Sequence, residues 1–552
     1  MFHFATVYEA VADAVADLPA IIQGERLISW GQFDDRCARL AACYLSHGLT
    51  TGSKVAMFLY NSPEYLETQA AAFKIRGCPV NVNYRYLEDE LAYLLDNADC
   101  EAIVFHASLG PRLEKIREKL PKLKLLIQVD DADLPDVEPI AGSLRYDEVL
   151  ATNQPAPRIQ RDDDDVYMLY TGGTTGMPKG VMYPSGGFAH ALTTLMTTNM
   201  RRPPFADIDD VVNTIRGMKA AGIQLKSMPC CPLMHGTGVW LGAFATHLTG
   251  GCVVLMNSRG LDCDELFSTV EKHGVNSIVI VGDAFARPML KTLRDHDATG
   301  HRWDLSSMLA IISSGAMFSQ EIKTGLFEYM PQMSIIDTLG STEGAMGTNV
   351  STKDGSMATA KFTLSDSVRV FDEDDNEVAA GSGIIGRVAT SAKALGVLSL
   401  GYYKDPEKSA KTFREVNGVR YSFPGDMALV ELDGSITLLG RGSNCINTGG
   451  EKVFPEEVEE AVKSHPRIAD CLVFGVHDER FGQRVVGVAS FVDLDGDLEP
   501  DLVIAHTKTV LSPYKAPRQL VWVPEVPRAP NGKADYKRAR ELFVAIYPET
   551  AN

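Results

Sequence analysis

Residues 166–184 read VYMLYTGGTTGMPKGVMYP, an apolar strand that runs into a loop rich in glycine and threonine. Small residues let the backbone approach an oxyanion closely, and the N–H groups of such a loop can point inward. Three threonine hydroxyls and the ammonium group of Lys179 add donors and positive charge. The stretch therefore predicts a cradle for a triphosphate rather than a plain turn.

The loop differs from the Walker A motif of other nucleotide-binding proteins. That motif has glycine directly before the lysine and serine or threonine directly after it. Here Pro178 precedes Lys179 and Gly180 follows it. The predicted phosphate cradle is therefore of another type.

Strands and helices alternate on both sides of the loop. Before it, strands are predicted at 54–60, 79–83 and 102–105, and helices at 33–48, 61–77 and 87–96. After it, apolar runs at 251–257, 277–281 and 309–315 alternate with helices near 262–273 and 284–294. Such alternation is typical of parallel sheets covered by helices on both faces. We therefore expect an α/β protein with two related, doubly wound sub-domains.

The pattern changes after about residue 365. Turn signals such as Asp433-Gly434 separate short alternating runs, which predicts the hairpins of a small β-barrel region. Another α/β pattern starts at residue 453, where Pro455 opens a helix with acidic residues in its first turn. The predicted domains are a large N-terminal domain, 1–441, and a small α+β domain, 442–552.

The composition is that of a globular protein and disfavours some function classes. The chain has 552 residues, too many for one simple domain, with 45% hydrophobic and 23% charged residues. Its 72 acidic and 53 basic residues give a formal net charge of −19. This charge argues against binding to nucleic acid or to an anionic membrane through a basic surface.

Other features predict a cytoplasmic protein. The first twenty residues lack a basic region and carry acids, unlike a signal peptide, and no run of 18 apolar residues predicts a transmembrane helix. Ten cysteines form no CxxC pair and mostly sit in apolar runs, as is typical of reduced core cysteines. The charged run Arg161–Asp165 is predicted to be a solvated loop.

The loop after residue 170 resembles the core motif of the adenylate-forming superfamily: acyl-CoA synthetases, peptide-synthetase adenylation domains and luciferases. The similarity extends over residues 30–540, with five motifs in the family's order. It implies that the loop binds ATP through Thr171, Gly172, Gly173, Thr174, Thr175, Gly176 and Lys179. Gly173 stands where serine is common in the family, so one donor is missing or is replaced by a backbone N–H or water.

Residues 335–345, IIDTLGSTEGA, end an apolar strand with Thr342 and Glu343. The pair is similar to the family's Thr-Glu motif, in which the hydroxyl contacts phosphate and the carboxylate helps to hold Mg²⁺. A hard cation prefers oxygen ligands, so a glutamate suits this position.

Further motifs are similar to the family's nucleoside-binding segments. Gly315 and Ala316 match the segment that runs along the adenine, and Leu339 stands where tyrosine usually stacks on it. By the same resemblance, Asp426 accepts hydrogen bonds from both ribose hydroxyls, and Arg441 also reaches the ribose. A carboxylate is a natural partner for a vicinal diol.

The C-terminal region is similar to the family's lid. Lys533, on an Asn-Gly turn, matches the family's catalytic lysine, which reaches the substrate carboxylate and the α-phosphate during adenylation. Ser443 occupies the hinge position, where aspartate or lysine is common. Gly449 and Gly450 match a loop that packs on the pantetheine arm of coenzyme A.

The acyl pocket is expected at residues 230–245 and 282–290. His235 and Gly236 resemble the family segment that borders the pocket. Both stretches are rich in methionine, phenylalanine, leucine, alanine and glycine, which predicts an apolar acid. Arg287 is the one cation in them that could mark a second carboxylate.

The resemblance implies an ATP-dependent acyl-CoA ligase, most like bacterial fatty-acyl or steroid side-chain CoA ligases. The acid and ATP first form acyl-AMP and pyrophosphate, with Lys533, Lys179, the threonine loop and Glu343 stabilising charge. The small domain then rotates about Ser443, and the thiol of coenzyme A attacks the acyl-AMP. The implied ligands are the acid, ATP, Mg²⁺ and coenzyme A, and a homodimer is a family-level expectation.

Two alternatives remain at this point. The chain could load a carrier-protein thiol, although it has no appended carrier domain. It could also be a non-catalytic regulator that binds ATP or acyl groups on the same fold. Retention of Lys179, Glu343, Asp426, Arg441 and Lys533 argues against a regulator.

Overall fold

A computed structural model provides the structure, which describes residues 2–131, 137–173, 176–199, 202–355, 360–393, 396–448, 451–478, 481–492, 498–529 and 532–550. The chain packs into two compact units. The first unit consists of residues 1–357 and 391–422, and the second of 358–390 and 423–552. The predicted domain boundary at 441/442 falls within the second unit and stays a prediction.

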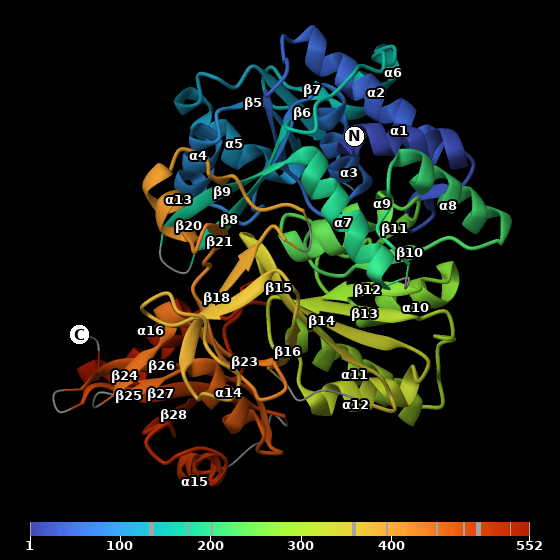
Figure 1. Cartoon of the computed structure of the whole chain (residues 1–552). Coiled ribbons are helices and arrows are strands. Elements are labelled where there is room, and N and C mark those ends of the chain that lie inside the picture. Colours follow the sequence, from blue (N-terminus) through green and yellow to red (C-terminus); the bar gives the residue numbers. More distant parts are fainter. Residues whose placement is uncertain are drawn as a thin grey trace. The chain divides into compact units, whose positions relative to one another are not determined.

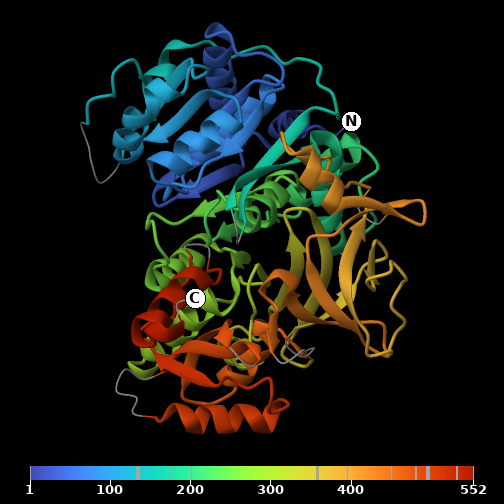
Figure 2. The same cartoon turned by 90° about the vertical axis from the view of Figure 1, so that its left-hand side faces the viewer.

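The first unit contains a five-stranded parallel sheet in the order β4-β3-β5-β6-β7 (Figures 1 and 2). Its strands are β3 (Lys54–Phe58), β4 (Cys78–Asn81), β5 (Cys100–His106), β6 (Leu125–Val129) and β7 (Leu144–Arg145). Side chains alternate along β3, so that Val55 and Met57 enter one buried cluster and Ala56 and Phe58 another. Both faces of the sheet are therefore buried, as predicted.

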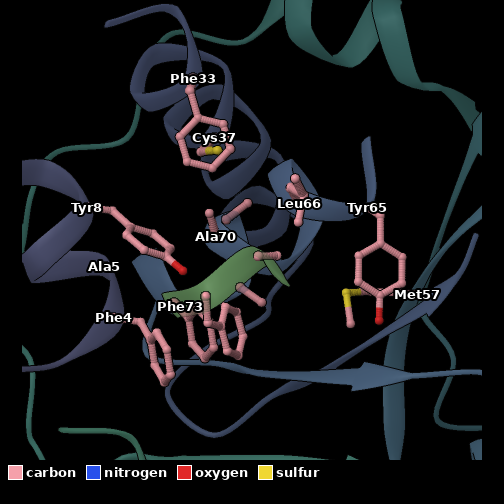
Figure 3. Packing of buried hydrophobic residues seen from close by; sticks show 14 of the residues in the cluster. Phe4, Ala5, Tyr8, Phe33, Cys37, Met57, Tyr65, Leu66, Ala70 and Phe73 are labelled. Atoms are coloured by element: carbon pink, nitrogen blue, oxygen red, sulfur yellow. The ribbon is translucent and has the colours of Figure 1, made fainter. Parts of the chain in front are cut away.

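Helices supply the opposite side of each cluster. Those on one face are α1 (Phe4–Val15), α2 (Trp30–Ser46) and α3 (Pro63–Lys74), and those on the other are α4 (Glu88–Asn97) and α5 (Gly110–Ile116). Phe4 stacks on Phe73 with ring centroids 4.6 Å apart, which joins α1 to α3 (Figure 3).

A second sheet of the first unit runs in the order β2-β1-β11-β10-β12-β13-β14-β15. Strands β1, β11, β10, β12, β13 and β14 pair in parallel, whereas β2 and β15 pair antiparallel at its ends. The strands are β1 (Pro19–Gln23), β2 (Arg26–Ser29), β10 (Lys226–Pro229), β11 (Cys252–Leu255), β12 (Ser277–Ile280), β13 (Ala310–Ser314), β14 (Ser334–Ser341) and β15 (Gly344–Ser351). The second predicted α/β sub-domain is thus present.

Three helices cover one face of this second sheet. They are α10 (Cys263–His273), α11 (Gly282–Ala298) and α12 (Gln320–Tyr329). Leu266, Met289 and Leu326 from these helices share a buried cluster with Ile278 and Ile311 of the strands. The apolar runs form paired strands, and the amphipathic helices between them bury one face of the resulting sheet.

The predicted phosphate loop lies on a hairpin of β8 (Val166–Gly173) and β9 (Gly176–Pro184), to which β19 (Gly401–Tyr402) adds a third strand. The remaining helices and strands of the first unit are α6 (Tyr146–Thr152), α7 (Ser185–Asn199), α8 (Ile208–Ala220), the π-helix Thr237–Phe244, α9 (Ala245–His247), α13 (Pro406–Thr412), β20 (Phe413–Val416) and β21 (Val419–Ser422).

The run Arg161–Asp165 is only partly solvated. Arg161 is buried, and its guanidinium group donates two hydrogen bonds of 2.8 Å to the carboxylate of Glu9. Asp165 accepts three hydrogen bonds from Arg76. The prediction of a solvated loop is therefore wrong for Arg161 and Asp165, because their partners lie far away in the sequence.

In the second unit, antiparallel pairs join β16 to β23, β17 to β18, β18 to β22 and β22 to β23. A second sheet runs β25-β24-β27-β26, with β28 beside β27. The elements are β16 (Lys361–Leu364), β17 (Val368–Phe371), β18 (Ile385–Ser391), β22 (Asp426–Val430), β23 (Ile436–Arg441), β24 (Ile446–Thr448), β25 (Glu451–Val453), α14 (Pro455–Lys463), β26 (Ile468–Asp478), β27 (Gly482–Phe491), α15 (Pro500–Val510), β28 (Gln519–Trp522) and α16 (Tyr536–Ile546).

Candidate active site

The phosphate hairpin is anchored to the N-terminal sheet by one buried amide. Asn81, at the end of β4, accepts a hydrogen bond from the Tyr170 N–H (2.7 Å) and donates one to the Tyr170 carbonyl (2.8 Å). Thr171 follows directly and pairs with Lys179 across the hairpin. Gly172, Gly173 and Gly176 lie at the hairpin tip, whereas Thr174 and Thr175 lie outside the described residues.

Lys179 lies against the third strand and the residues that follow it. Its ammonium group lies 5.7 Å from the centroid of the Tyr402 ring and 3.8 Å from a carboxylate oxygen of Asp405. Burial and the neighbouring ammonium group of Lys408 lower the pKa of Lys179, and Asp405 opposes this shift. The hairpin thus presents a partly desolvated cation next to its glycine-rich tip.

Thr342 and Glu343 form the two-residue turn between β14 and β15. The hydroxyl of Tyr183 donates to the Thr342 carbonyl (3.0 Å), and the hydroxyl of Tyr402 donates to the Glu343 carboxylate (2.7 Å). Two tyrosines of the β8–β9–β19 sheet therefore hold this turn.

One tyrosine joins the two predicted phosphate-binding motifs of the first unit. The Tyr402 ring lies beside the Lys179 ammonium group, and its hydroxyl contacts Glu343. The half-buried Glu343 presents a carboxylate oxygen next to the Thr342 turn. Magnesium in nucleotide sites takes one or two carboxylates together with substrate phosphates, so this turn has the chemistry of a Mg²⁺ site.

The segment after β13 is rigidly held. Gly315 has φ +90°, a conformation that favours glycine, and Ala316 follows it. The Asp283 carboxylate accepts hydrogen bonds from the Ser319 N–H (2.9 Å) and hydroxyl (3.1 Å). Leu339 is buried in the neighbouring strand β14. The predicted adenine segment is thus preformed, with an aliphatic side chain in the adjoining strand.

The predicted acyl-pocket segment is tied to the N-terminal sheet. Asn61 accepts a hydrogen bond from the Leu233 N–H (2.8 Å), and Asn81 donates one to the Met234 carbonyl (2.7 Å). His235 follows and is half-buried. A side chain at Gly236 would meet the ring of Trp240 on the following π-helix, with the nearest atom 3.2 Å from its Cβ. An indole therefore packs against the backbone at Gly236.

Arg287 is neutralised within the same unit. Its guanidinium group lies 3.2 Å from the carboxylate of Asp283, four residues earlier on α11. Asp283 is buried. The cation in residues 282–290 thus has a carboxylate partner from the protein itself.

The predicted ribose residues meet in the second unit. Asp426 and Arg441 are cross-strand partners on β22 and β23, with Arg441 Nε 3.1 Å from the Asp426 carboxylate. Arg441 also donates to the Pro424 carbonyl (2.8 Å), and Asp426 is buried. Burial and the charge of Asp426 raise the pKa of Glu456, at the start of α14, to about 7. Because Arg441 holds the Asp426 carboxylate, the diol of a ribose would meet a carboxylate that is already oriented.

Lys533 is exposed on a turn that a half-buried ion pair supports. The guanidinium group of Arg528 donates to both carboxylate oxygens of Asp470, at 2.6 and 2.7 Å, and to the Gly532 carbonyl (3.0 Å). The Ala529 N–H donates to the Lys533 carbonyl (2.8 Å). The backbone at Lys533 is therefore fixed on an exposed turn.

A buried carboxyl group, Glu459, lies near this support. One of its oxygens accepts hydrogen bonds from the Val473 N–H (2.9 Å) and the Tyr536 hydroxyl (3.0 Å). Burial, followed by the charge of Glu456, raises the pKa of Glu459 to about 8. Glu459 is thus favoured in its neutral form in the folded protein.

Replacing Glu459 with glutamine should stabilise the second unit at alkaline pH. A carboxyl group whose folded pKa exceeds its unfolded pKa stabilises most below about pH 4.5, and this contribution is lost as the pH rises through about 8. The amide keeps the acceptor without the charge, so the gain at pH 9 should be on the order of 3 kcal/mol. Calorimetric unfolding at pH 5.5 and pH 9 measures it, and parallel pH curves for both proteins would contradict the buried neutral form.

The sequence predicts lid roles for Ser443, Gly449 and Gly450. Ser443 lies in a short 3-10 turn, Gly442–Asn444, between β23 and β24. Gly449 and Gly450 lie outside the described residues. The roles of all three stay predictions.

Several contacts of the site were not expected from the sequence. Tyr183 and Tyr402 hold the Thr342–Glu343 turn, and Asn81 anchors the hairpin. Glu456 and Lys408 adjoin the predicted ribose and phosphate residues. Tyrosine, asparagine, glutamate and lysine are common residue types, so no local sequence pattern marks these positions. Only the pairing of strands far apart in the sequence brings these residues to the site.

The comparisons with known proteins agree with the predicted class. The family model described as "AMP-binding enzyme" matches residues 8–403, and the model "AMP-binding enzyme C-terminal domain" matches residues 457–533. Both matches lie in the order expected for a large domain followed by a smaller one.

Curated relatives are similar over almost the whole chain. A 3-oxocholest-4-en-26-oate–CoA ligase of Rhodococcus rhodochrous is 37% identical over 548 residues, covering 98% of this chain and 95% of the relative. The medium-chain acyl-CoA ligase Mig of Mycobacterium avium is 38% identical over 563 residues, covering 98% of both chains.

Solved structures share the fold. An anthranilate CoA ligase, AuaEII, crystallised with anthranoyl-AMP, is 20% identical with a TM-score of 0.82, over 99% of this chain and 98% of that one. ATP-bound MatB of Rhodopseudomonas palustris is 23% identical with a TM-score of 0.78, over 98% and 99% of the two chains. The fold class predicted from the sequence is confirmed, and the chain belongs to the AMP-binding enzyme family, the adenylate-forming enzymes that include the acyl-CoA synthetases.

Proposed function

We propose that the protein joins an apolar carboxylic acid to coenzyme A through an acyl-AMP intermediate, releasing AMP and pyrophosphate. The substrate class is a medium- or long-chain fatty acid or a steroid or terpenoid side-chain acid. The proposal rests on Tyr402, which contacts both Lys179 and Glu343. It thereby brings a cation and a carboxylate together at a glycine-rich hairpin. The printed activities of the relatives, medium-chain and steroid side-chain CoA ligation, support the acid class.

The apolar substrate also follows from the pocket segments. Arg287 is paired with Asp283, whose carboxylate offsets its charge and makes it a weaker site for the second carboxylate of a dicarboxylic acid. Trp240 packs its ring against Gly236, and its indole N–H donates to the buried Tyr167 hydroxyl (2.8 Å). The segment therefore offers mainly carbon surface to a ligand.

In the adenylation step, the protein's part is positioning and charge stabilisation. Lys179 and the backbone of the hairpin tip would hold the phosphates, and Lys533 would reach the reacting carboxylate and the α-phosphate. Glu343 and Thr342 would hold Mg²⁺, which when bound neutralises phosphate charge. Asp426 and Arg441 would orient the ribose, so that the acid oxygen lies in line with the α-phosphate.

In the thioester step, the small domain would turn about Ser443 and withdraw Lys533. The loop of Gly449 and Gly450 would then guide the pantetheine arm, and the thiol sulfur would attack the acyl carbon and expel AMP. Among the helices that the structure describes, none combines the length and apolarity needed to cross a bilayer. A cytoplasmic location and a homodimer stay predictions.

A substrate screen tests the proposal. The purified chain is incubated with ATP, Mg²⁺, coenzyme A and acids from C4 to C18, aromatic acids and steroid side-chain acids. Acyl-CoA, AMP and pyrophosphate should appear in equal amounts, with apolar acids preferred. Transfer to a carrier protein but not to coenzyme A would overturn the proposed acceptor, and a preference for dicarboxylates would overturn the apolar pocket.

Replacing Asp426 with alanine should raise the KM for ATP by about 10- to 100-fold. A hydrogen bond between an ionised group and a hydroxyl contributes about 1.5–3 kcal/mol, so the net loss of one such bond to the ribose corresponds to about 10- to 100-fold. Steady-state kinetics at saturating acid measures the change.

Asp433, at the tip of the same hairpin, provides the control. Its side chain is 60% exposed and pairs with Lys361 at the surface. Asp433→Ala should leave the KM for ATP within about twofold, because a solvated pair contributes little. An unchanged KM in Asp426→Ala would remove the ribose assignment.

A further inference from the structure

A second lysine, Lys408, lies next to Lys179 of the phosphate hairpin. Lys408 is exposed on α13, whose first residue follows Asp405. Its ammonium group lies 5.8 Å from the centroid of the Tyr402 ring, and that of Lys179 lies 5.7 Å from the same centroid. Two ammonium groups thus share one aromatic ring.

The position of the shared ring is fixed from two sides. The Tyr402 hydroxyl donates to Glu343 (2.7 Å), and its backbone N–H donates to the Ser409 hydroxyl (2.8 Å). Strand β19 pairs Tyr402 with Val181, two residues beyond Lys179 on β9. The pairing of β19 with β9 therefore brings α13, which follows β19 and carries Lys408, next to Lys179.

The repulsion between these two ammonium groups is only partly offset by the protein. Asp405 lies 3.8 Å from Lys179, and its carboxylate also accepts a hydrogen bond from the backbone N–H of Lys408 (3.0 Å). In the part of the chain that the structure describes, no carboxylate forms an ion pair with Lys408. The repulsion contributes to the lowered pKa of Lys179. An anion with several charges placed between the lysines would relieve this repulsion.

We propose that Lys408 binds phosphate together with Lys179, and that the pair holds the pyrophosphate group of ATP and of the product. This role rests on the proposed adenylation function. Pyrophosphate carries several negative charges, and two ammonium point charges can follow it as it separates from the α-phosphate. Glu343 accepts a hydrogen bond from the hydroxyl of the same tyrosine, and it would hold Mg²⁺, which when bound neutralises phosphate charge.

Direct binding of pyrophosphate tests the proposal without requiring turnover. Isothermal titration calorimetry with sodium pyrophosphate and Mg²⁺ compares the wild-type chain with Lys408→Gln. Loss of one charged contact should weaken pyrophosphate binding about tenfold. Lys408→Arg, which keeps the charge, should retain most of the affinity.

Lys411 provides a matched control, because it is exposed on the same helix three residues further on. Lys411→Gln changes the net charge equally and should bind pyrophosphate like the wild type. Equal affinities for Lys408→Gln, Lys411→Gln and the wild type would overturn the role of Lys408, as would undetectable binding to the wild type.

A kinetic readout separates this role from general damage. The Ki of pyrophosphate as product inhibitor and the KM for ATP should each rise about tenfold in Lys408→Gln. Thioester formation from supplied acyl-AMP and coenzyme A should stay within twofold, since no pyrophosphate takes part. A wild-type chain that binds pyrophosphate but activates no acid would contradict the proposed function and leave the role of Lys408 in binding intact.

Discussion

Replacing Lys533 with alanine should slow acyl-AMP formation by roughly 10²–10³ or more, the loss expected when a main charge-stabilising donor is removed. Lys533 is exposed, and the hydrogen bonds of its turn come from Arg528 and Ala529, so the substitution should not disturb the fold. Acid-dependent exchange between ATP and labelled pyrophosphate measures this half-reaction.

The second half-reaction distinguishes a catalytic lysine from a structural one. With supplied acyl-AMP and coenzyme A, Lys533→Ala should form thioester at nearly the wild-type rate, because Lys533 would have left the site. Lys537, exposed on α16, is the control, and Lys537→Ala should leave both half-reactions unchanged. Equal loss of both half-reactions in Lys533→Ala would refute the division of labour between them.

Replacing Lys323 with methionine should lower the free energy of unfolding by about 3–5 kcal/mol, the cost of leaving one charge of a buried pair without its partner. Lys323 on α12 forms an ion pair with Asp337 on β14, and their side chains are only 1% and 12% exposed. Urea unfolding of the full chain measures the loss. Because β14 also carries Leu339, the KM for ATP should rise as well.

The loss should depend on pH in a defined direction. Burial raises the pKa of Asp337, and Lys323 opposes this shift. Without Lys323 the pKa of Asp337 in the folded protein rises further. A carboxyl group with a raised folded pKa makes the folded protein less stable as the pH increases. The deficit of Lys323→Met should therefore be larger at pH 8 than at pH 5.5.

Two further variants check the cause. Lys323→Met combined with Asp337→Asn should recover much of the stability, because no buried charge is then left unpaired. Lys291 pairs with Asp295 at the surface, where the side chains are 76% and 60% exposed. Lys291→Met should cost less than about 1 kcal/mol. Equal losses in Lys291→Met and Lys323→Met would contradict the role of burial.

Local patterns predicted most of the fold. The alternation of Val55, Ala56, Met57 and Phe58 between two clusters is the period of a strand buried on both faces. The helix at Pro455 begins where the proline and the following glutamates predict it. These signals lie within a few residues, so the sequence alone carries them.

The candidate site was predictable only in part. Glycines, threonines and Lys179 in one short stretch predict a phosphate loop, and the structure places Thr171 opposite Lys179 on one hairpin. The hydrogen bond between Tyr402 and Glu343 joins residues 59 positions apart, and no local pattern signals it. Such partners follow from the pairing of β19 with β9, which is decided by the packing of the whole unit.

By itself, the sequence determined the family, the order of the motifs and the residue types that could bind phosphate, ribose and Mg²⁺. Only the tertiary structure decided that Lys408 lies beside Lys179, that Asp283 neutralises Arg287 and that Glu459 is held as a neutral acid. The reason is physical. Coulomb interactions and desolvation depend on distance and burial, and these depend on how strands and helices far apart in the chain pack together.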